Sequence, residues 1–184
     1  AHGRHLFEHG PFLVARYTSA LPTTFTDADH LELRSLIFDA RSGALLSRSF
    51  HKFFNLFERE SLDDLDFSRP ARLRLKLDGS MLGAFLHEGR VLFHTRGGVT
   101  RQARAALNDA HDGHFALIQE AWGDGLTPIF EWTHPDNRVI IAYDRPQVTL
   151  LTLRDRETGA YHDLRAERLA ARHGVPIAPT LAEG

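Results

Sequence analysis

The chain of 184 residues contains no cysteine, which excludes disulfide bonds, zinc sites with thiolate ligands and cysteine nucleophiles. The same absence fits a protein of a reducing cytoplasm, where we expect this one to reside. No apolar run reaches the roughly 18 residues of a membrane span and no signal peptide is visible, so we expect no membrane partner. The chain starts at Ala1 rather than Met, from which we expect a trimmed or processed N-terminus. Its formal net charge of −2 provides no global positive field, so any nucleic-acid site must be a local patch.

Lysine is almost absent as well. Lys52 and Lys76 are the two lysines, whereas arginine occurs twenty times. An arginine stays protonated at any biological pH and cannot act as a nucleophile, but a lysine can lose its proton where its surroundings favour the neutral amine. A chain with this bias is expected to keep lysine where a neutral amine or a compact ammonium is required.

Lys76 lies in the sequence RLRLKLDGS, which alternates strictly from residue 72 to 78. The alternation predicts a strand with Arg72, Arg74, Lys76 and Asp78 on one face and leucines on the other. The two arginines would lower the pKa of the lysine and the aspartate would raise it, so the sequence leaves the balance open. The Gly-Ser that follows is expected to end the strand and to let the backbone approach a ligand. The alternative is a solvated polar face, the commoner origin of an isolated K-x-D-G.

The periodicity of the whole chain predicts an α+β fold of antiparallel β-sheets with a helical insertion. An apolar fraction of 42% is enough for the core of one domain. Residues 1–30 are expected to be irregular with one strand at most, and residues 51–58 to form a loop or a short helical turn. The expected hairpins are residues 31–50, 83–97 with its tip at Glu88-Gly89, 128–144, and 148–163 with its turn near Glu157-Thr158-Gly159. The expected helices are residues 99–122, capped by Thr100 and divided near Asp112-Gly113, and residues 164–173, closed by Gly174.

Twelve histidines raise the question of a metal site. His111 and His114 have the i, i+3 spacing, but no third ligand of a known zinc signature follows. We therefore expect these two to be surface histidines.

Several segments together resemble one family. KLDGS is similar to the K-x-D-G signature of ATP-dependent ligases and capping enzymes, in which the lysine is the nucleophile. The order and spacing of five further segments, from about residue 30 to 165, resemble RNA ligases of the T-even phage, tRNA-repair type. These segments are LRSLIFD, SRSFHKFFNLFE, VLFHTRGG, IFEWTHPDNRVIIAYD and VTLLTLRDRETGAY.

The resemblance implies a nucleotidyltransferase (ATP-grasp-like ligase) domain that uses ATP with Mg²⁺ or Mn²⁺. Lys76 would attack the α-phosphate of ATP, expel pyrophosphate and carry AMP as a phosphoramidate. The AMP would pass to the 5′-phosphate of an RNA such as a tRNA, and a 3′-hydroxyl would then displace it. Residues 1–184 would be the N-terminal part of this adenylylation domain, because the family's later E-G and K-x-K motifs and its RNA-specificity domain do not occur in the sequence.

The resemblance also implies roles for the other basic residues. Arg34 and Lys52 would bind the phosphates of ATP, and the alternative for Lys52 is a solvated loop ammonium. Arg96 would be a further phosphate contact where the phage enzymes carry lysine. Three neighbouring phenylalanines are expected mainly in the core, at least one of them purely structural: Phe53, Phe54 and Phe57.

The remaining nucleotide contacts implied by the resemblance come from three segments. Leu75, Asp78 and Gly79 flank the lysine. Phe93 would stack on or line the adenine, and the alternative is a core aromatic of its hairpin. Glu131 would contact the ribose or support the metal, and the alternative is a cross-strand ion pair.

One departure from the family is local. The family usually has R-G where this chain has Arg34-Ser35, which suits the site only if the backbone there is ordinary β structure. Two other functions stay open: a DNA ligase or capping-type nucleotidyltransferase, and a non-catalytic nucleotide- or RNA-binding remnant of the same fold.

Overall fold

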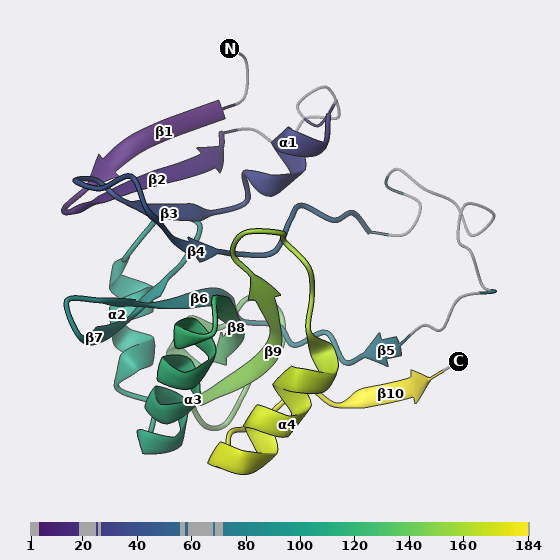
Figure 1. Ribbon diagram of the computed structural model, residues 1–184. Coiled ribbons are helices and arrows are strands. Elements are labelled where there is room, and N and C mark those ends of the chain that lie inside the picture. Colours follow the sequence, from purple (N-terminus) through teal and green to yellow (C-terminus); the bar gives the residue numbers. More distant parts are fainter. Residues whose placement is uncertain are drawn as a thin grey trace.

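The computed structural model describes residues 4–18, 25, 27–55, 58, 68 and 72–183, and in this part of the chain three antiparallel sheets form the framework (Figure 1). The N-terminal sheet has the order β1 (Arg4–His9), β2 (Phe12–Tyr17), β3 (Leu36–Asp39), β4 (Leu45–Arg48). The central sheet has the order β7 (Arg90–His94), β6 (Ser80–His87), β8 (Leu126–Thr133), β9 (Gln147–Asp155). A separate ribbon pairs β5 (Arg72–Arg74) with β10 (Thr180–Glu183).

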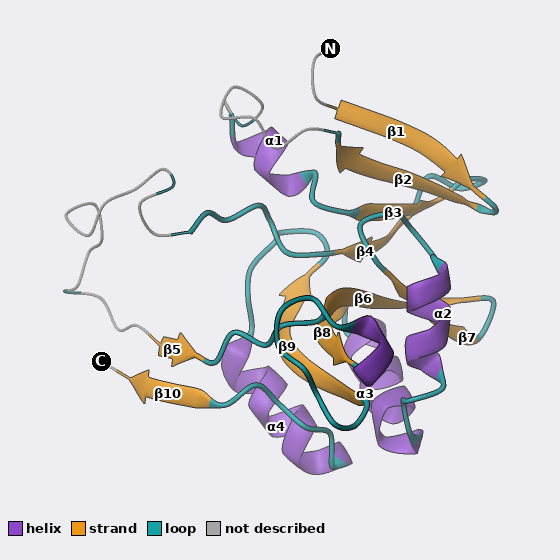
Figure 2. Ribbon diagram, turned by 180° about the vertical axis from the view of Figure 1, so that it is seen from behind, coloured by secondary structure: helices purple, strands orange, loops and turns teal. Residues whose placement is uncertain are grey.

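Three helices cover one face of the central sheet (Figure 2). They are α2 (Arg101–Leu107), α3 (Asp112–Gly123) and α4 (Asp163–His173). The predicted caps are confirmed: the Thr100 side chain accepts from the backbone N–H of Ala103, and Gly174 ends α4 with φ 64°. The predicted division of the first helical segment is also confirmed, because four residues separate α2 from α3. The core on this side buries apolar side chains of the sheet and all three helices, among them Phe93, Phe130, Leu117 and Leu169.

The N-terminal sheet packs on the opposite side, against β6 and the chain that follows β7. The second core cluster joins Phe12, Val14 and Ile37 of the N-terminal sheet to Phe85 of β6 and Val99. Burial of these side chains supplies the main free energy that holds the two sheets together, at about 25 cal/mol for each Å² of apolar surface.

A polar contact lies inside this apolar interface. His94 is fully buried; its Nδ1 lies 3.1 Å from Ser35 Oγ, and its Nε2 lies 2.7 Å from Ser47 Oγ. Burial lowers the pKa of His94 to about 4, so the ring is neutral near pH 7. Gly83 is opposite His94 in the β6–β7 pair and makes room for the ring. The serine that departs from the family pattern therefore has a structural partner, and a glycine there would leave His94 Nδ1 without that hydroxyl.

The predicted hairpin tip is confirmed, with Glu88 at φ 50° and Gly89 at φ 73° between β6 and β7. The N-terminal prediction was wrong, because residues 4–17 form the β1–β2 hairpin. The hairpin predicted for residues 31–50 is confirmed for β3 and β4, but a short helix, α1 (Ala28–Glu32), precedes it, with Asp27 as its cap. Of the segment 51–58, residues 51–55 have no regular secondary structure.

Two predicted strands are wrong. Residues 138–144 do not follow β8 as a strand; a 3-10 helix, η3 (Pro135–Asn137), leads into an irregular loop, and the next strand is β9. The predicted turn at Gly159 is present, but beyond it only Tyr161 makes an isolated contact with Arg154 of β9. The prediction for His114 was also wrong: it is buried and its Nε2 lies 2.8 Å from the carbonyl oxygen of Val148.

The strict alternation of residues 72–78 is broken as well. Only residues 72–74 are in a strand, and Leu73 is exposed rather than buried. Leu75, Lys76 and Leu77 all line one pocket, so the alternation does not separate leucines from lysine. The reason is that, among the described residues, β5 pairs only with the short strand β10, which leaves its one leucine, Leu73, in solvent. Within the described residues, no helix has the length and apolarity to cross a bilayer.

The fit of His94 over Gly83 is testable. A Cβ at position 83 would lie 2.1 Å from His94 Nε2, whereas a Cβ at Gly123, in α3, meets no atom within 4 Å. We expect Gly83→Ala to lower the free energy of unfolding by at least about 2 kcal/mol, because the buried ring has no room to move. Gly123→Ala is the matched control and should change it by less than about 1 kcal/mol. Urea unfolding of both variants measures this, and equal effects would contradict the proposed fit.

Candidate active site

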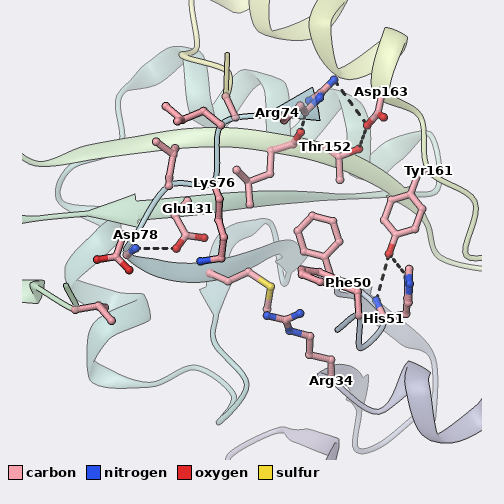
Figure 3. A pocket seen from close by; sticks show the side chains of 18 residues that line it. Arg34, Phe50, His51, Arg74, Lys76, Asp78, Glu131, Thr152, Tyr161 and Asp163 are labelled. Atoms are coloured by element: carbon pink, nitrogen blue, oxygen red, sulfur yellow. Dashed lines mark hydrogen bonds and ion pairs between the residues drawn. The ribbon is translucent and has the colours of Figure 1, made fainter. Parts of the chain in front are cut away.

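A cavity of about 740 Å³ lies where the ribbon, the central sheet and the segment after β4 meet (Figure 3). The β5–β6 connection contributes Leu75, Lys76, Asp78 and Gly79, and β8 contributes Glu131. Rings from other segments and the guanidinium of Arg34 complete the opposite wall. Six of the nine predicted site residues therefore line one pocket: Arg34, Leu75, Lys76, Asp78, Gly79 and Glu131.

The lysine is positioned by the glycine that follows it. Gly79 N–H donates to Glu131 Oε1 at 2.9 Å, which ties the connection after Lys76 to the central sheet. A Cβ at Gly79 would lie 2.2 Å from the carbonyl oxygen of Trp132, so only glycine fits. We expected the backbone at this glycine to approach a ligand closely. In the structure it approaches β8 closely.

Glu131 is the carboxylate at the centre of the pocket. Burial raises the pKa of Glu131 to about 7, opposed by the hydrogen bond from Gly79 and by the positive charges of Lys76 and Arg34. Both cations therefore act electrostatically on the same carboxylate. Figure 3 shows Lys76 and Glu131 side by side, with the Arg34 guanidinium pointing into the pocket from the other wall.

Arg34 reaches the pocket from the N-terminal half of the chain, between α1 and β3. Its Cζ lies 4.7 Å from the ring centroid of Phe53. Burial lowers the pKa of Arg34, and the carboxylate of Glu131 partly compensates. A guanidinium remains charged at neutral pH under such conditions, so the pocket keeps a cation opposite Lys76.

Asp78 was expected to contact the nucleotide, but in the structure its hydrogen bonds are to the loop after β8. Its Oδ2 accepts from the backbone N–H groups of Ile140 and Ile141, both at 2.6 Å, and its own N–H donates to Tyr143 Oη at 3.0 Å. These hydrogen bonds, with the charge of Lys76, lower the pKa of Asp78. In this structure Asp78 therefore fixes the loop after β8 at the pocket edge, where Val139 lines the cavity.

Three predicted residues are not among those that line the cavity. Lys52 Nζ donates to the carbonyl of Phe53 at 2.8 Å and lies 4.4 Å from the ring centroid of Phe54. Arg96 stacks on Tyr17, 5.1 Å from its ring centroid. Both lie beyond the cavity wall.

The position of Phe93 contradicts the adenine contact that the resemblance implied for it. It is fully buried in the core and packs against Phe130 with 5.6 Å between ring centroids, so it does not line the cavity. The side chains on the other face of β7, such as His94, point to the N-terminal sheet. The alternative role, a core aromatic of the hairpin, fits this position.

The neighbouring phenylalanines differ from the expectation in part. Phe53 lines the cavity and is 46% exposed, so it is not a core residue. Phe54 packs against Phe25, with 5.7 Å between ring centroids, as a structural residue would. Phe57 lies outside the described residues.

The arginines that the alternation placed beside Lys76 pair with acidic side chains of α4. Arg72 and Arg74 both pair with Glu167 of α4, at 2.7 and 3.0 Å, and Arg74 lies 3.9 Å from Asp163. Their charges are thus matched by carboxylates of the helix. Arg74 still lines the same pocket as Lys76, as do Arg34, Asp78 and Glu131. The charge of Lys76 acts on both of these carboxylates.

Several lining residues were missed by sequence analysis. The largest are rings from two separate segments, Phe50 and His51 after β4 and Tyr161 after β9. His51 and Tyr161 are 110 residues apart and lie 2.7 Å from each other between Nδ1 and Oη. No local sequence pattern links two positions so far apart. The one indication in the sequence is that His51 is adjacent to Lys52, a predicted site residue.

The donor groups of the pocket determine whether it could hold a metal ion. Among the described residues, no three histidine, cysteine, aspartate or glutamate side chains form a group that could hold an ion. Glu131 is a half-buried carboxylate in a pocket that Arg34, Arg74 and Lys76 also line, with Asp78 at its edge. Mg²⁺ is commonly held by one or two carboxylates together with substrate phosphates, so this donor set fits a metal that arrives with a nucleotide.

Comparison with solved structures defines the fold class first. The chain superposes on an archaeal ATP-dependent RNA ligase with a TM-score of 0.66 at 16% identity, covering 99% of this chain and 48% of that one. It also superposes on a "Putative ATP-dependent DNA ligase" from Aquifex aeolicus with a TM-score of 0.68 at 14% identity, covering 98% and 48%. The fold is thus that of the nucleotidyltransferase part of ATP-dependent ligases, as the sequence predicted.

The sequence comparisons define the family. The RNA ligase family model matches residues 32–179, and the chain belongs to this family. A "Putative RNA ligase" of Thermovibrio ammonificans is 34% identical over 165 residues, which are 88% of this chain and 43% of that protein. RNA ligase 1 of bacteriophage TS2126 is 29% identical over 159 residues, which are 80% and 40%. The chain therefore spans less than half the length of these relatives.

The burial of Glu131 predicts a dependence of stability on pH. Between the ordinary pKa of 4.5 and the raised value of about 7, the unfolded chain loses this proton and the folded chain keeps it. The free energy of unfolding contributed by Glu131 therefore falls as pH rises through this window and levels off above it. Glu131→Gln should remove that fall. As pH rises from 4.5 to 7, the melting temperature of the variant should therefore rise relative to that of the unmodified protein. A constant difference across the window would contradict the raised pKa.

The role of Asp78 predicts a local effect. Asp78→Ala should speed hydrogen exchange at the amides of Ile140 and Ile141, because their acceptor is removed. Asp136→Ala is the control, since that carboxylate is exposed and lies on the same connection between β8 and β9. Exchange resolved by mass spectrometry tests this, and unchanged protection of the loop in Asp78→Ala would exclude the proposed role.

Proposed function

We propose that this chain is the adenylylation part of an ATP-dependent RNA ligase and that Lys76 is its nucleophile. The observation that carries the proposal is the meeting of Lys76, Arg34 and Glu131 in one pocket of a chain that belongs to the RNA ligase family. In the first step the neutral amine of Lys76 would attack the α-phosphorus of ATP. A P–N bond forms, the bond to the bridging oxygen breaks, and pyrophosphate leaves with that oxygen.

The charges of the pocket suit this step. Phosphoryl transfer depends mainly on positioning and on cations placed where phosphate charge builds up. Arg34 can contact two phosphate oxygens with its planar fork, so it is the group we assign to the leaving phosphates. Lys52 and Arg96 do not line the cavity, so a phosphate role for them would need their side chains to turn toward the nucleotide. Leu75 and Gly79 are suited to hold the nucleotide through backbone and apolar contacts.

Mg²⁺ or Mn²⁺ is the metal we propose, with Glu131 as its ligand in this chain together with phosphate oxygens. The ion supplies neutralisation of phosphate charge when it is bound. Glu131 itself holds the Gly79 amide, so the same carboxylate would orient the segment that follows Lys76.

In the later steps, the AMP would pass to the 5′-phosphate of an RNA, and a 3′-hydroxyl would then displace the AMP and seal the ends. A tRNA is one possible substrate. The similarity to a DNA ligase structure leaves DNA ends as a competing substrate, which an end-joining assay with RNA and DNA strands decides.

We also propose that residues 1–184 are the N-terminal part of a longer adenylylation domain. The support is that the relatives are more than twice as long as the matched region. Exposed leucines on the ribbon, Leu73 at 64% and Leu181 at 65%, fit a surface that more of the domain would cover. A non-catalytic remnant of the fold is the second candidate, and it would bind ATP without forming an adduct.

The proposal predicts a protein–AMP adduct. In the full-length enzyme, incubation with ATP and Mg²⁺ or Mn²⁺ should give an adduct that is stable in alkali and labile in acid, as a P–N bond is. Its mass and fragmentation should place AMP on Lys76, and Lys76→Ala should abolish it. Lys76→Arg should abolish it as well, because a guanidinium keeps its charge but cannot act as a nucleophile. Arg90→Lys is the control, since it exchanges an exposed basic residue that does not line the pocket and should keep the adduct. An adduct that persists in Lys76→Ala would refute the assignment of the nucleophile.

A further inference from the structure

Four rings form one continuous wall of the pocket, and the lysine chemistry uses none of them. They belong to Phe50, His51, Phe53 and Tyr161. Ring centroids are 5.6 Å apart for Phe50 and Phe53, 5.7 Å for Phe50 and Tyr161, and 5.6 Å for His51 and Tyr161. We call these four residues the aromatic wall.

The aromatic wall is held in place from behind. Tyr161 Oη accepts from the backbone N–H of His51 at 3.2 Å and lies 2.7 Å from its Nδ1. Arg154, which is buried, lies 4.9 Å from the ring centroid of Tyr161. Its guanidinium donates to the carbonyl of Ser49 at 2.5 Å and to Glu32 Oε1 at 2.7 Å. The wall thus needs little rearrangement to receive a ligand, which lowers the entropic cost of binding.

The surface of the aromatic wall is uncharged. Burial lowers the pKa of His51 and raises the pKa of Tyr161, so both rings are neutral near pH 7. Phe53 is partly exposed, and the guanidinium of Arg34 lies over its ring. Neutral rings next to a guanidinium are the surface on which proteins stack unpaired nucleobases.

The chemistry of the pocket indicates which base would reach this wall. In-line displacement places pyrophosphate opposite Lys76 in the first step, and Arg34 is the cation assigned to it. In the second step Lys76 is the leaving group, so the RNA 5′-phosphate must approach from the side that pyrophosphate vacated. That side carries Arg34 and, stacked on it, Phe53. The adenine of ATP is attached to the α-phosphate and not to the phosphates that Arg34 would hold.

We infer that the aromatic wall binds the first base of the 5′-phosphorylated RNA strand, which stacks on Phe53. The inference rests on the proposed function. It assigns an RNA-end site to this part of the ligase, so selection of the 5′ end would begin here.

Fluorescence of 2-aminopurine, which stacking on an aromatic ring quenches, tests this. The probe is a 5′-phosphorylated hexaribonucleotide with 2-aminopurine at its first position, titrated with the chain. Phe53→Leu keeps an apolar side chain but removes the ring, and should weaken quenching by about tenfold in midpoint concentration. Phe53→Trp should restore it. Phe38→Leu is the matched control, because Phe38 lines a separate hollow beside β1 and β3, and should leave the midpoint unchanged.

Two further probes locate the base. A hexaribonucleotide with 2-aminopurine at its 3′ end should show little quenching in either protein, because that base does not reach Phe53. With 2-aminopurine riboside triphosphate, the midpoint should be the same for Phe53→Leu and the unmodified chain. Equal midpoints for Phe53→Leu and the unmodified chain with the 5′ probe would overturn the inference. So would an effect on the triphosphate as large as on the 5′ probe, because the wall would then belong to ATP. Adduct formation is measured on the same preparations, so a failure of the proposed lysine chemistry is seen separately from a failure of base stacking.

Discussion

The buried contact between the two larger sheets is the constraint on which the site depends. His94 of the central sheet lies between two serine hydroxyls of the N-terminal half, and apolar side chains surround it. One of those serines, Ser35, is adjacent to Arg34, whereas Lys76 and Glu131 belong to the central-sheet side. The sheet interface therefore sets how far the guanidinium stands from the amine. A hydrogen bond that is fully buried has few acceptable geometries, so it fixes this relation more narrowly than apolar packing alone.

The same arrangement determines the electrostatics of the pocket. Lys76 and Arg34 both act on Glu131, a carboxylate that burial alone would keep protonated, and Asp78 acts on it in the opposite direction. Such a pocket favours a ligand that brings negative charge. Glu131 neutralises only part of the positive charge of Lys76 and Arg34, and phosphate oxygens would neutralise the rest. The uncharged aromatic wall beside Arg34 adds a surface for a base. Phosphates at the cations and a base at the wall are the arrangement that the proposed RNA-end site requires.

The sequence predicted the parts of the molecule whose causes are local. Glu88-Gly89, Thr100 and Gly174 each determine a turn or a helix end through their own backbone preferences, and the structure confirms all three. Lys76 was identified by its rarity, together with the family motif around it. Residues 138–144 have the composition of a strand, yet the carboxylate of Asp78 takes two of their amides, and this tertiary hydrogen bonding overrides β propensity.

Other parts could not be predicted because they depend on contacts distant in sequence. Tyr161 meets His51 across 110 residues, and Arg74 is directed to α4 by Glu167, which no periodicity near the lysine reveals. Motif position alone likewise placed Phe93 at the nucleotide, although the pleat of β7 directs it into the core.

The most direct measurement is a crystal structure of the chain with the α,β-methylene analogue of ATP, which Lys76 cannot cleave. The account predicts the α-phosphorus next to Lys76 Nζ and the terminal phosphates at the Arg34 guanidinium, with His94 still between its two serines. Terminal phosphates bound away from Arg34, or an α-phosphorus out of reach of Lys76, would contradict it.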